Sequence, residues 1–125
     1  MIKGLGIDLI ETERIARALS RHGKRFEERV FTQLELSQCA DRPDRVQALA
    51  ARFAAKEACL KALGTGWAEG LAFRQIEIVR AVNGRPEMRL DGAAQALARS
   101  MNVESVHLSM THQPGTAAAT VILEG

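Results

Sequence analysis

A long helical period in the middle of the sequence limits the possible folds more than any other pattern. Pro43 suits the first turn of a helix, the periodic pattern continues to Leu63, and Gly64 suits a left-handed stop. Apolar side chains recur at helical spacing along this segment, at Val46, Leu49, Phe53 and Leu60. The sequence therefore predicts one long helix over residues 43–63 with an apolar stripe.

Alternating periods on both sides of this helix predict strands. Residues 2–10 alternate, with Leu5, Ile7 and Leu9 on one side and Gly4, Gly6, Asp8 and Ile10 on the other. Further strands are expected at Phe73–Val82, at Glu87–Leu90, through Val106, Leu108 and Met110, and at Thr116–Leu123. The first two of these are joined by Asn83-Gly84, a type I′ turn signal, and the last two by the turn Gln113-Pro114-Gly115.

Three shorter helices complete the prediction. Thr12 suits the cap of a helix that reaches about residue 22, and Gly23 suits its end. Thr32 and Glu35 have the spacing of a capping box, which predicts a short helix over residues 33–40. Asp91 suits the cap of a helix over residues 93–101. The order β-ααα-ββ-α-ββ predicts a single α+β domain, residues 1–125, with a mostly antiparallel sheet packed on the long helix.

Composition excludes several classes of protein. The chain has 125 residues, 46% apolar and 26% charged, which is typical of a globular domain. Its longest apolar runs fall far short of the ~20 residues that cross a membrane, and no export signal is visible. Cys39 and Cys59 make no disulfide framework, so we expect a reduced, cytoplasmic setting. A net charge of +2 and the absence of Tyr argue against nucleic-acid binding.

Two acidic residues occupy unusual positions. Asp8 lies in the middle of a predicted strand, where Asp is disfavoured, although an edge-strand Asp facing water is an alternative. Glu57 lies within about 40° of Phe53 around the long helix, on the apolar stripe. An intrahelical pair with Lys61, four residues on, would explain Glu57 but not Asp8. If strand and helix pack together, the two carboxylates could converge on a Mg²⁺ ion with open positions for phosphate oxygens.

These residues lie in motifs that resemble a known family. Gly6-Ile7-Asp8, Arg14-Ile15 and the block from Arg52 to Gly66, with its Phe-x-x-Lys-Glu-x-x-x-Lys pattern, resemble the 4′-phosphopantetheinyl transferases. The length, the ending Leu108-Ser109-Met110-Thr111-His112 and Ala117-Ala118-Ala119 are similar to the short bacterial branch, the holo-[acyl-carrier-protein] synthases. The resemblance covers roughly residues 4–123.

The resemblance implies transfer of the phosphopantetheine arm of coenzyme A to a serine of an apo-acyl carrier protein, which releases adenosine 3′,5′-bisphosphate. Asp8 and Glu57 are then the expected Mg²⁺ ligands and, with Lys61, the expected catalytic residues. Lys56 is a weaker candidate, expected at the surface. The general base stays open between His112 and a water linked to the metal or the phosphate.

Coenzyme A contacts are expected from Arg52, Lys61 and His112, and from Arg85-Pro86 after the Asn-Gly turn, although these two could form a plain β-turn. His107 is expected to be structural. Gly64-Thr65-Gly66 follows a helix and is expected to be its C-terminal turn. Thr116 stands where many members of the family carry an aromatic residue.

A basic helix face gives the expected partner contact. Arg14, Arg17 and Arg21 recur at i, i+3 and i+7, and Arg25 follows. Acyl carrier proteins are small and acidic, so this face is expected to bind the carrier rather than to be a solvated helix face. The resemblance also implies a homotrimer with sites between subunits. Two other classes remain: a non-catalytic module that binds acidic partners, and a different Mg²⁺-dependent nucleotide enzyme.

Overall fold

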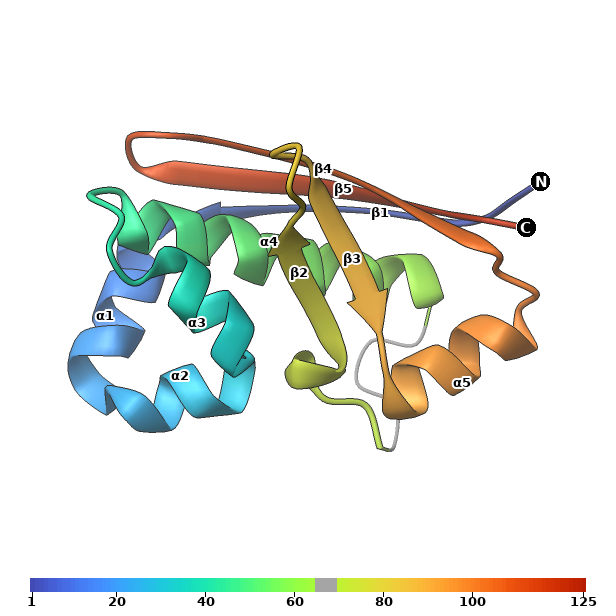
Figure 1. The fold of residues 1–125 in the computed structure, drawn as a ribbon, viewed down its shortest axis with the longest axis horizontal. Coiled ribbons are helices and arrows are strands. Elements are labelled where there is room, and N and C mark those ends of the chain that lie inside the picture. The colour runs from blue at the N-terminus through green and yellow to red at the C-terminus, as the bar shows by residue number, and fades with distance from the viewer. Residues whose placement is uncertain (65–69) are drawn as a thin grey trace.

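A three-stranded antiparallel sheet lies along one long helix in the computed structural model, which describes residues 1–64 and 70–125. The strands β1 (Ile2–Glu11), β5 (Thr116–Glu124) and β4 (Ser105–Gln113) follow the order β1-β5-β4. Helix α4 (Arg45–Leu63) crosses beneath this sheet (Figure 1). The predicted α+β class is confirmed, and the long helix is its centre.

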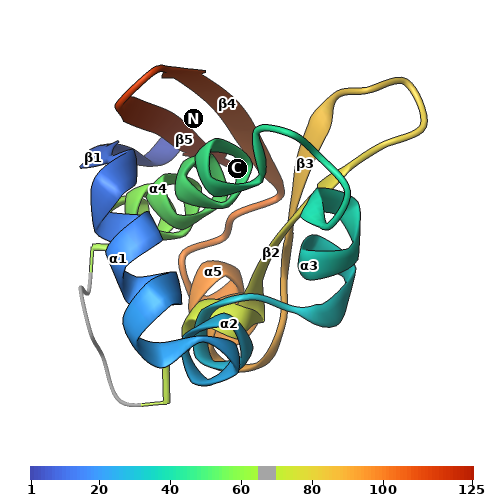
Figure 2. The ribbon, with the colours of Figure 1, turned by 90° about the vertical axis from the view of Figure 1, so that its left-hand side faces the viewer.

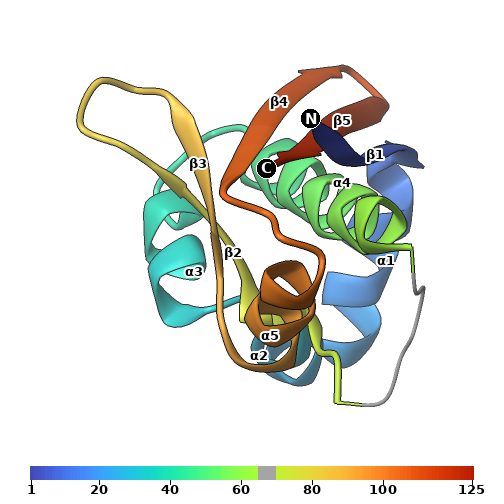
Figure 3. The same cartoon turned by 90° about the vertical axis from the view of Figure 1, so that its right-hand side faces the viewer.

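A separate hairpin forms a second antiparallel sheet. Strands β2 (Ile76–Arg80) and β3 (Pro86–Leu90) pair only with each other among the described residues, and the short 3-10 turn η1 (Phe73–Gln75) precedes them. The prediction of one sheet is therefore too simple. The tip of this hairpin stands away from the three-stranded sheet (Figures 2 and 3).

The hairpin turn differs from its prediction. A type I′ turn needs positive φ at both central residues, but Gly84 (φ 83°) has it and Asn83 does not. Instead, the Gly84 amide donates to the Ala81 carbonyl at 2.8 Å, and the Ala81 amide donates to the Arg85 carbonyl at 2.8 Å. The loop is thus longer than the predicted two-residue turn.

Three short helices gather at one end of α4, and a fourth lies near its other end (Figure 1). These are α1 (Thr12–His22), α2 (Lys24–Val30), α3 (Gln33–Cys39) and α5 (Gly92–Ser100). Helix α2 is absent from the prediction: it has seven residues and follows Gly23, whose left-handed φ of 50° turns the chain sharply. Within the described residues, four helices rather than three precede the second sheet.

The predicted helix ends are mostly confirmed. The capping box of Thr32 and Glu35 is present, Asp91 caps α5 through the Gly92 amide, and Gly64 ends α4 in the left-handed region. Thr12 makes no cap, because the helix already begins at that residue. Helix α4 begins at Arg45, so Pro43 lies before its first turn.

Glycines let β1 approach α4 closely. A Cβ at Gly6 would overlap the Ala58 carbonyl oxygen, and one at Gly4 would overlap that of Ala62. The strand therefore turns its glycine side toward the helix. Its apolar side faces outward, with Leu5, Ile7 and Leu9 exposed by 62%, 65% and 70%.

Helix α4 is buried on nearly all sides rather than along one stripe. Fourteen of its 19 residues are buried. Small alanines allow strands and helices to pack around it, and Leu49, Phe53 and Leu60 of the predicted stripe belong to the core. Between Ala48 and Leu63, only Glu57 and Lys61 are not buried.

Candidate active site

The two accessible positions between Ala48 and Leu63 of α4, Glu57 and Lys61, lie beside Asp8 of β1. Lys61 Nζ lies 3.2 Å from Asp8 Oδ1 and donates to the Ile7 carbonyl at 2.9 Å. The close approach of strand and helix, which Gly6 permits, is what brings these side chains together. Lys61 pairs with Asp8 and not with Glu57, so the simple intrahelical pair does not form.

Glu57 is a half-buried carboxylate whose charge is under-compensated. In the described part of the chain it makes no hydrogen bond or ion pair. Burial raises the pKa of Glu57, and the negative charge of Asp8 raises it further, while Arg14 and Lys61 act in the opposite direction. Asp8 and Glu57 are therefore near enough to repel each other, and a cation between them would relieve the repulsion.

This pair fits a magnesium site by its donor set. Mg²⁺ prefers carboxylate oxygens and is usually held by one or two of them, together with water and phosphate oxygens. Among the described residues, no group of three or more His, Cys, Asp or Glu side chains gathers as a complete metal cage. The two carboxylates would thus leave positions open for a phosphate.

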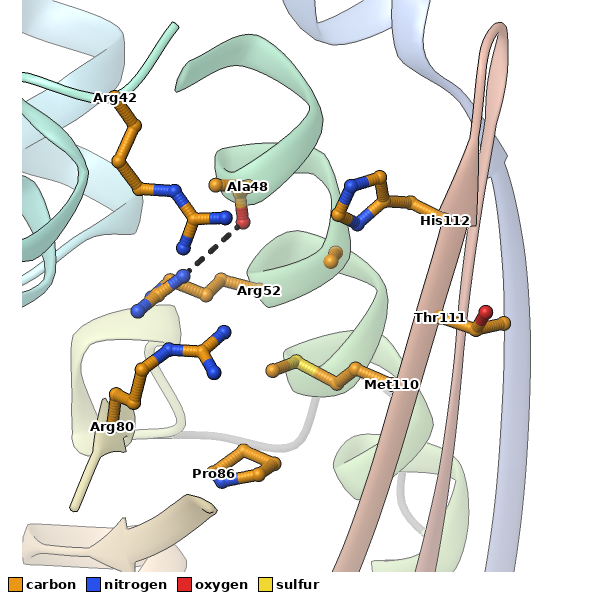
Figure 4. A pocket seen from close by; sticks show the side chains of 9 residues that line it. Arg42, Ala48, Arg52, Arg80, Pro86, Met110, Thr111 and His112 are labelled. Atoms are coloured by element: carbon orange, nitrogen blue, oxygen red, sulfur yellow. Dashed lines mark hydrogen bonds between the residues drawn. The ribbon is translucent and has the colours of Figure 1, made fainter. Parts of the chain in front are cut away.

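A cationic pocket of about 320 Å³ lies on the other side of α4. It brings together Arg52, Pro86 and His112, three of the predicted coenzyme A contacts (Figure 4). The rest of its lining consists of Arg42, Ala48, Ala51, Arg80, Met110 and Thr111. Three guanidinium groups and one imidazole make this pocket suited to an anion with several oxygens.

Arg42 and Arg80 are pocket residues that the sequence did not indicate. They come from the loop before α4 and from the end of β2, and no local pattern connects them with Arg52. Arg85, a predicted contact, does not line this pocket. It borders a neighbouring hollow of about 380 Å³ together with Pro86 and His107.

Arg52 is fixed by neutral acceptors inside the protein. Its Nε donates to the Ile78 carbonyl at 3.3 Å and its Nη2 donates to Gln38 Oε1 at 3.3 Å, while Nη1 reaches the Ala48 carbonyl at 3.5 Å (Figure 4). Burial lowers the pKa of Arg52 from its very high ordinary value. The guanidinium is therefore a positioned charge beneath the pocket rather than a mobile surface group.

A carboxylate lies beside the pocket, in contact with two of the side chains that line it. Asp44 accepts two hydrogen bonds from Arg42, at 2.8 Å from Nε and 2.9 Å from Nη2. Its Oδ2 also lies 3.5 Å from His112 Nε2. The hydrogen bond from Arg42 holds the pKa of Asp44 below its usual range.

The structure contradicts the prediction made for Lys56. It was expected at the surface, yet it is completely buried and forms an ion pair with Glu35 at 2.9 Å. Its Nζ also donates to the carbonyls of Phe73 (3.0 Å) and Ile76. Three acceptors compensate for the lost hydration, so Lys56 joins α3, α4 and the start of β2 and takes no part in the candidate site.

The two halves of the predicted site lie apart in one chain. Asp8 pairs with Ala119 of β5, which in turn pairs with Met110 of β4, so two strand spacings, about 10 Å, separate Asp8 from the edge that carries the pocket. On α4, Arg52 and Glu57 are five residues apart, which places them about 140° apart around the helix axis. The carboxylates and the pocket thus face different sides.

The basic face predicted on the first helix is exposed. Arg14, Arg17, Arg21 and Arg25 are all exposed, and three of them line a shallow hollow of about 300 Å³ with Ala18 and His22. Arg14 also contributes its charge to Glu57. One member of the basic face, Arg14, therefore lies near enough to Glu57 to act on its charge.

The structure also places the remaining histidine and cysteine candidates and the glycine turn after α4. His107 pairs with Glu124 at 2.8 Å on the exposed side of β4. Cys39 and Cys59 are free and buried, and burial raises the pKa of Cys59 to about 12. Gly64 forms the expected C-terminal turn of α4, while Thr65 and Gly66 lie outside the described residues. No helix in the described ranges is long and apolar enough to cross a membrane.

Comparison with known proteins identifies the family. The model of the 4′-phosphopantetheinyl transferase superfamily matches residues 4–121. The chain belongs to this superfamily. It is 49% identical to the holo-[acyl-carrier-protein] synthase of Maridesulfovibrio salexigens over 124 residues, 99% of each chain. It is 48% identical to that of Solidesulfovibrio magneticus over 125 residues, 100% of each chain.

Solved structures of the superfamily share the fold. The holo-[acyl-carrier-protein] synthase of Neisseria meningitidis is 36% identical, with a TM-score of 0.91 and complete coverage of both chains. That of Helicobacter pylori, solved in complex with coenzyme A, is 31% identical, with a TM-score of 0.84 over 96% of this chain and 99% of that one. The phosphopantetheinyl transferase resemblance seen in the sequence is confirmed.

Proposed function

We propose that this chain transfers 4′-phosphopantetheine from coenzyme A to a serine of apo-acyl carrier protein. The observation that carries the proposal is the Asp8, Glu57 and Lys61 constellation in a chain that the model of the transferase superfamily matches over residues 4–121. In the reaction the serine oxygen bonds to the pantetheine-side phosphorus and loses its proton. The bond from that phosphorus to the bridging oxygen breaks, and adenosine 3′,5′-bisphosphate leaves.

Asp8 and Glu57 would hold a Mg²⁺ ion, which when bound neutralises charge on the diphosphate oxygens. Lys61, already anchored to Asp8 and the Ile7 carbonyl, places a further positive charge beside the same carboxylates. Its amine is more than half exposed and can reach an arriving phosphate. These residues act on charge that develops during transfer, which is where positioned electrostatics contribute most to rate.

The cationic pocket is the proposed seat of the 3′-phosphate of coenzyme A. Arg52 is fixed beneath it, and Arg42, Arg80 and His112 converge on it (Figure 4). Pro86 contributes an apolar surface suited to the adenosine. Arg85 remains a proposed contact from the adjoining hollow.

The exposed basic face of α1 and α2 is the proposed docking site for the carrier. Arg14, Arg17, Arg21 and Arg25 present positive charge to solvent (α1 and α2 are seen in Figure 2). A small acidic carrier would be steered toward it. Because Arg14 also acts on Glu57, a carrier bound here would present its serine near the carboxylates.

We further propose a homotrimer with sites between subunits. The expected number of subunits, three, follows from the family resemblance. Two features of the chain support shared sites: Leu5, Ile7 and Leu9 form an exposed apolar face, and the two half-sites face different sides of α4. A neighbouring subunit that covered the apolar face could bring its pocket to these carboxylates. The free, buried cysteines are consistent with a reduced, cytoplasmic setting.

One experiment separates this function from its rivals. The protein is incubated with coenzyme A, Mg²⁺ and an apo-acyl carrier protein, and the carrier is weighed by mass spectrometry. A mass gain of one phosphopantetheine group, with release of adenosine 3′,5′-bisphosphate, is expected. A binding module would leave the carrier mass unchanged in a stable complex, and a different nucleotide enzyme would consume coenzyme A without modifying the carrier.

A further inference from the structure

Asp44 occupies the N-cap position of α4 without capping the helix. An Asp at this position usually accepts a hydrogen bond from a backbone amide in the first turn. Here the side chain makes no such bond. It turns instead to Arg42 and His112, two of the residues that line the cationic pocket.

The contacts of the three guanidinium groups and the imidazole of the pocket single out this carboxylate. Arg52 donates to carbonyl and amide oxygens, and Arg80 donates to the Gly84 carbonyl at 2.8 Å; these acceptors are neutral. Arg42 and His112 both face Asp44. In the described part of the chain, Asp44 is therefore the carboxylate that contacts side chains lining the pocket, although it does not itself belong to the lining.

We propose that Asp44 is an internal competitor for the phosphate that this pocket binds. The inference rests on the proposed function, which places the 3′-phosphate of coenzyme A there. Asp44 would weaken the binding of every ligand with this phosphate, substrate and product alike. It would thereby reduce the preference for coenzyme A over dephospho-coenzyme A and speed the release of adenosine 3′,5′-bisphosphate.

The geometry indicates that Asp44 competes with the phosphate for Arg42 and His112, rather than positioning these side chains to bind it. Asp44 takes the Nε and Nη2 edge of Arg42, the forked edge by which a guanidinium also binds phosphate. Its contact with His112, at 3.5 Å, is the looser one and is the one that an arriving phosphate would displace first. An aspartate is ionised at neutral pH at its ordinary pKa, and the hydrogen bond from Arg42 lowers the pKa of Asp44 further, so its charge opposes that of the ligand.

The test is Asp44→Asn, which keeps the size of the side chain and a residue type that suits an N-cap. Binding of adenosine 3′,5′-bisphosphate is measured by titration calorimetry, and KM is measured for coenzyme A and dephospho-coenzyme A. We expect the bisphosphate to bind roughly three- to tenfold tighter at low salt, with less gain at high salt. The KM for coenzyme A should fall, and that for dephospho-coenzyme A should stay nearly constant.

Two further variants make the result decisive. Asp41→Asn removes an exposed carboxylate three residues away and should change bisphosphate binding much less. In an Arg42→Gln background, Asp44→Asn should still tighten binding, because the carboxylate opposes the phosphate directly. If Asp44 only positioned Arg42, the single variant would weaken binding and the change would vanish in the Arg42→Gln background.

The outcomes separate this inference from the proposed function. A wild-type protein that binds neither coenzyme A nor the bisphosphate would overturn both. A wild-type protein that binds both ligands, with an Asp44→Asn variant that binds the bisphosphate equally or more weakly, overturns the competitor alone. Equal gains for Asp41→Asn and Asp44→Asn would also overturn it, since net charge rather than contact would then be responsible.

Discussion

Glu57 and Lys56 are neighbours in the sequence, yet the sequence indicated the environment of Glu57 alone and not that of Lys56. The position of Glu57 on the apolar stripe of the helix indicated an unusual carboxylate, and the structure places it near Asp8. The burial of Lys56 depends on Glu35 of α3 and on the Phe73 and Ile76 carbonyls, which come from two segments about 20 residues away on either side. Local periodicity carries no information about such acceptors, so the expectation of a surface position for Lys56 is wrong.

The carboxylate pair gives the first prediction. Asp8→Ala and Glu57→Ala should each fold and lose transfer activity by several orders of magnitude, because each removes a charge that acts on the transition state. Glu57→Gln should fail as well, since it keeps the shape and loses the charge. Turnover is measured at saturating Mg²⁺ with circular dichroism as the check on folding. Near-normal turnover of either alanine variant would rule out these residues as metal ligands.

The buried ion pair gives a prediction about stability. Lys56→Met leaves Glu35 buried without its cation and should lower the free energy of unfolding by about 3–5 kcal/mol. Urea denaturation measures this change. Lys24→Met, at an exposed lysine, is the matched control and should change stability by less than about 0.5 kcal/mol. Similar losses for both variants would show that the Lys56 pair contributes little.

Among the helices and strands, the glycines of β1 decide how the site is assembled. The alternation of residues 2–10 predicted the strand correctly, and Gly4 and Gly6 turned out to be its packing side. The alternation alone does not show which side of the strand is buried; this becomes clear only when α4 is placed against the glycine side. Helix α2 was missed for a related reason: it is held by its neighbours after Gly23 and has no cap of its own in the sequence.

Gly6→Ala tests the strand-to-helix contact. A Cβ there would overlap the Ala58 carbonyl oxygen, so β1 must move away from α4 and carry Asp8 with it. We expect a large loss of stability, of at least about 2 kcal/mol, and loss of activity. Leu5→Ala, on the outward side of the same strand, provides the comparison for monomer packing. An active Gly6→Ala variant of normal stability would contradict this packing.

The basic face of α1 and α2 gives a prediction about the carrier. Charge reversal at Arg14, Arg21 or Arg25 should raise the KM for carrier protein and leave coenzyme A binding nearly unchanged, because these residues lie outside the pocket. Steering by such a face also weakens with salt, since the Debye length is ~8 Å at 0.15 M. A carrier KM that responds neither to the substitutions nor to ionic strength would remove this face from the mechanism.

For the molecule as a whole, the sequence predicted the class and order of elements better than the distribution of the site. The motifs around Asp8 and Glu57, and those around Arg52 and His112, all pointed to one reaction. These motifs could not indicate that, within one chain, the two groups of residues lie on either side of β5 and on different sides of α4. Pairing between strands and rotation around a helix set that separation, and both depend on contacts far apart in the sequence.

The separation leads to a prediction about assembly. Mass measurement at micromolar concentration should show a trimer, and Ile7→Asp should dissociate it, because this change places a charge on the exposed apolar face. Asp8→Ala and His112→Ala proteins, each impaired alone, are then mixed under subunit exchange. If Asp8 and Glu57 of one subunit work with His112 of the next, random mixing leaves about a quarter of the interfaces with both halves intact. Activity should recover to a comparable fraction of the wild-type value. A fully active monomer would refute the assembly, whereas verified mixed trimers without recovery would refute shared sites and leave the chemistry of each residue standing.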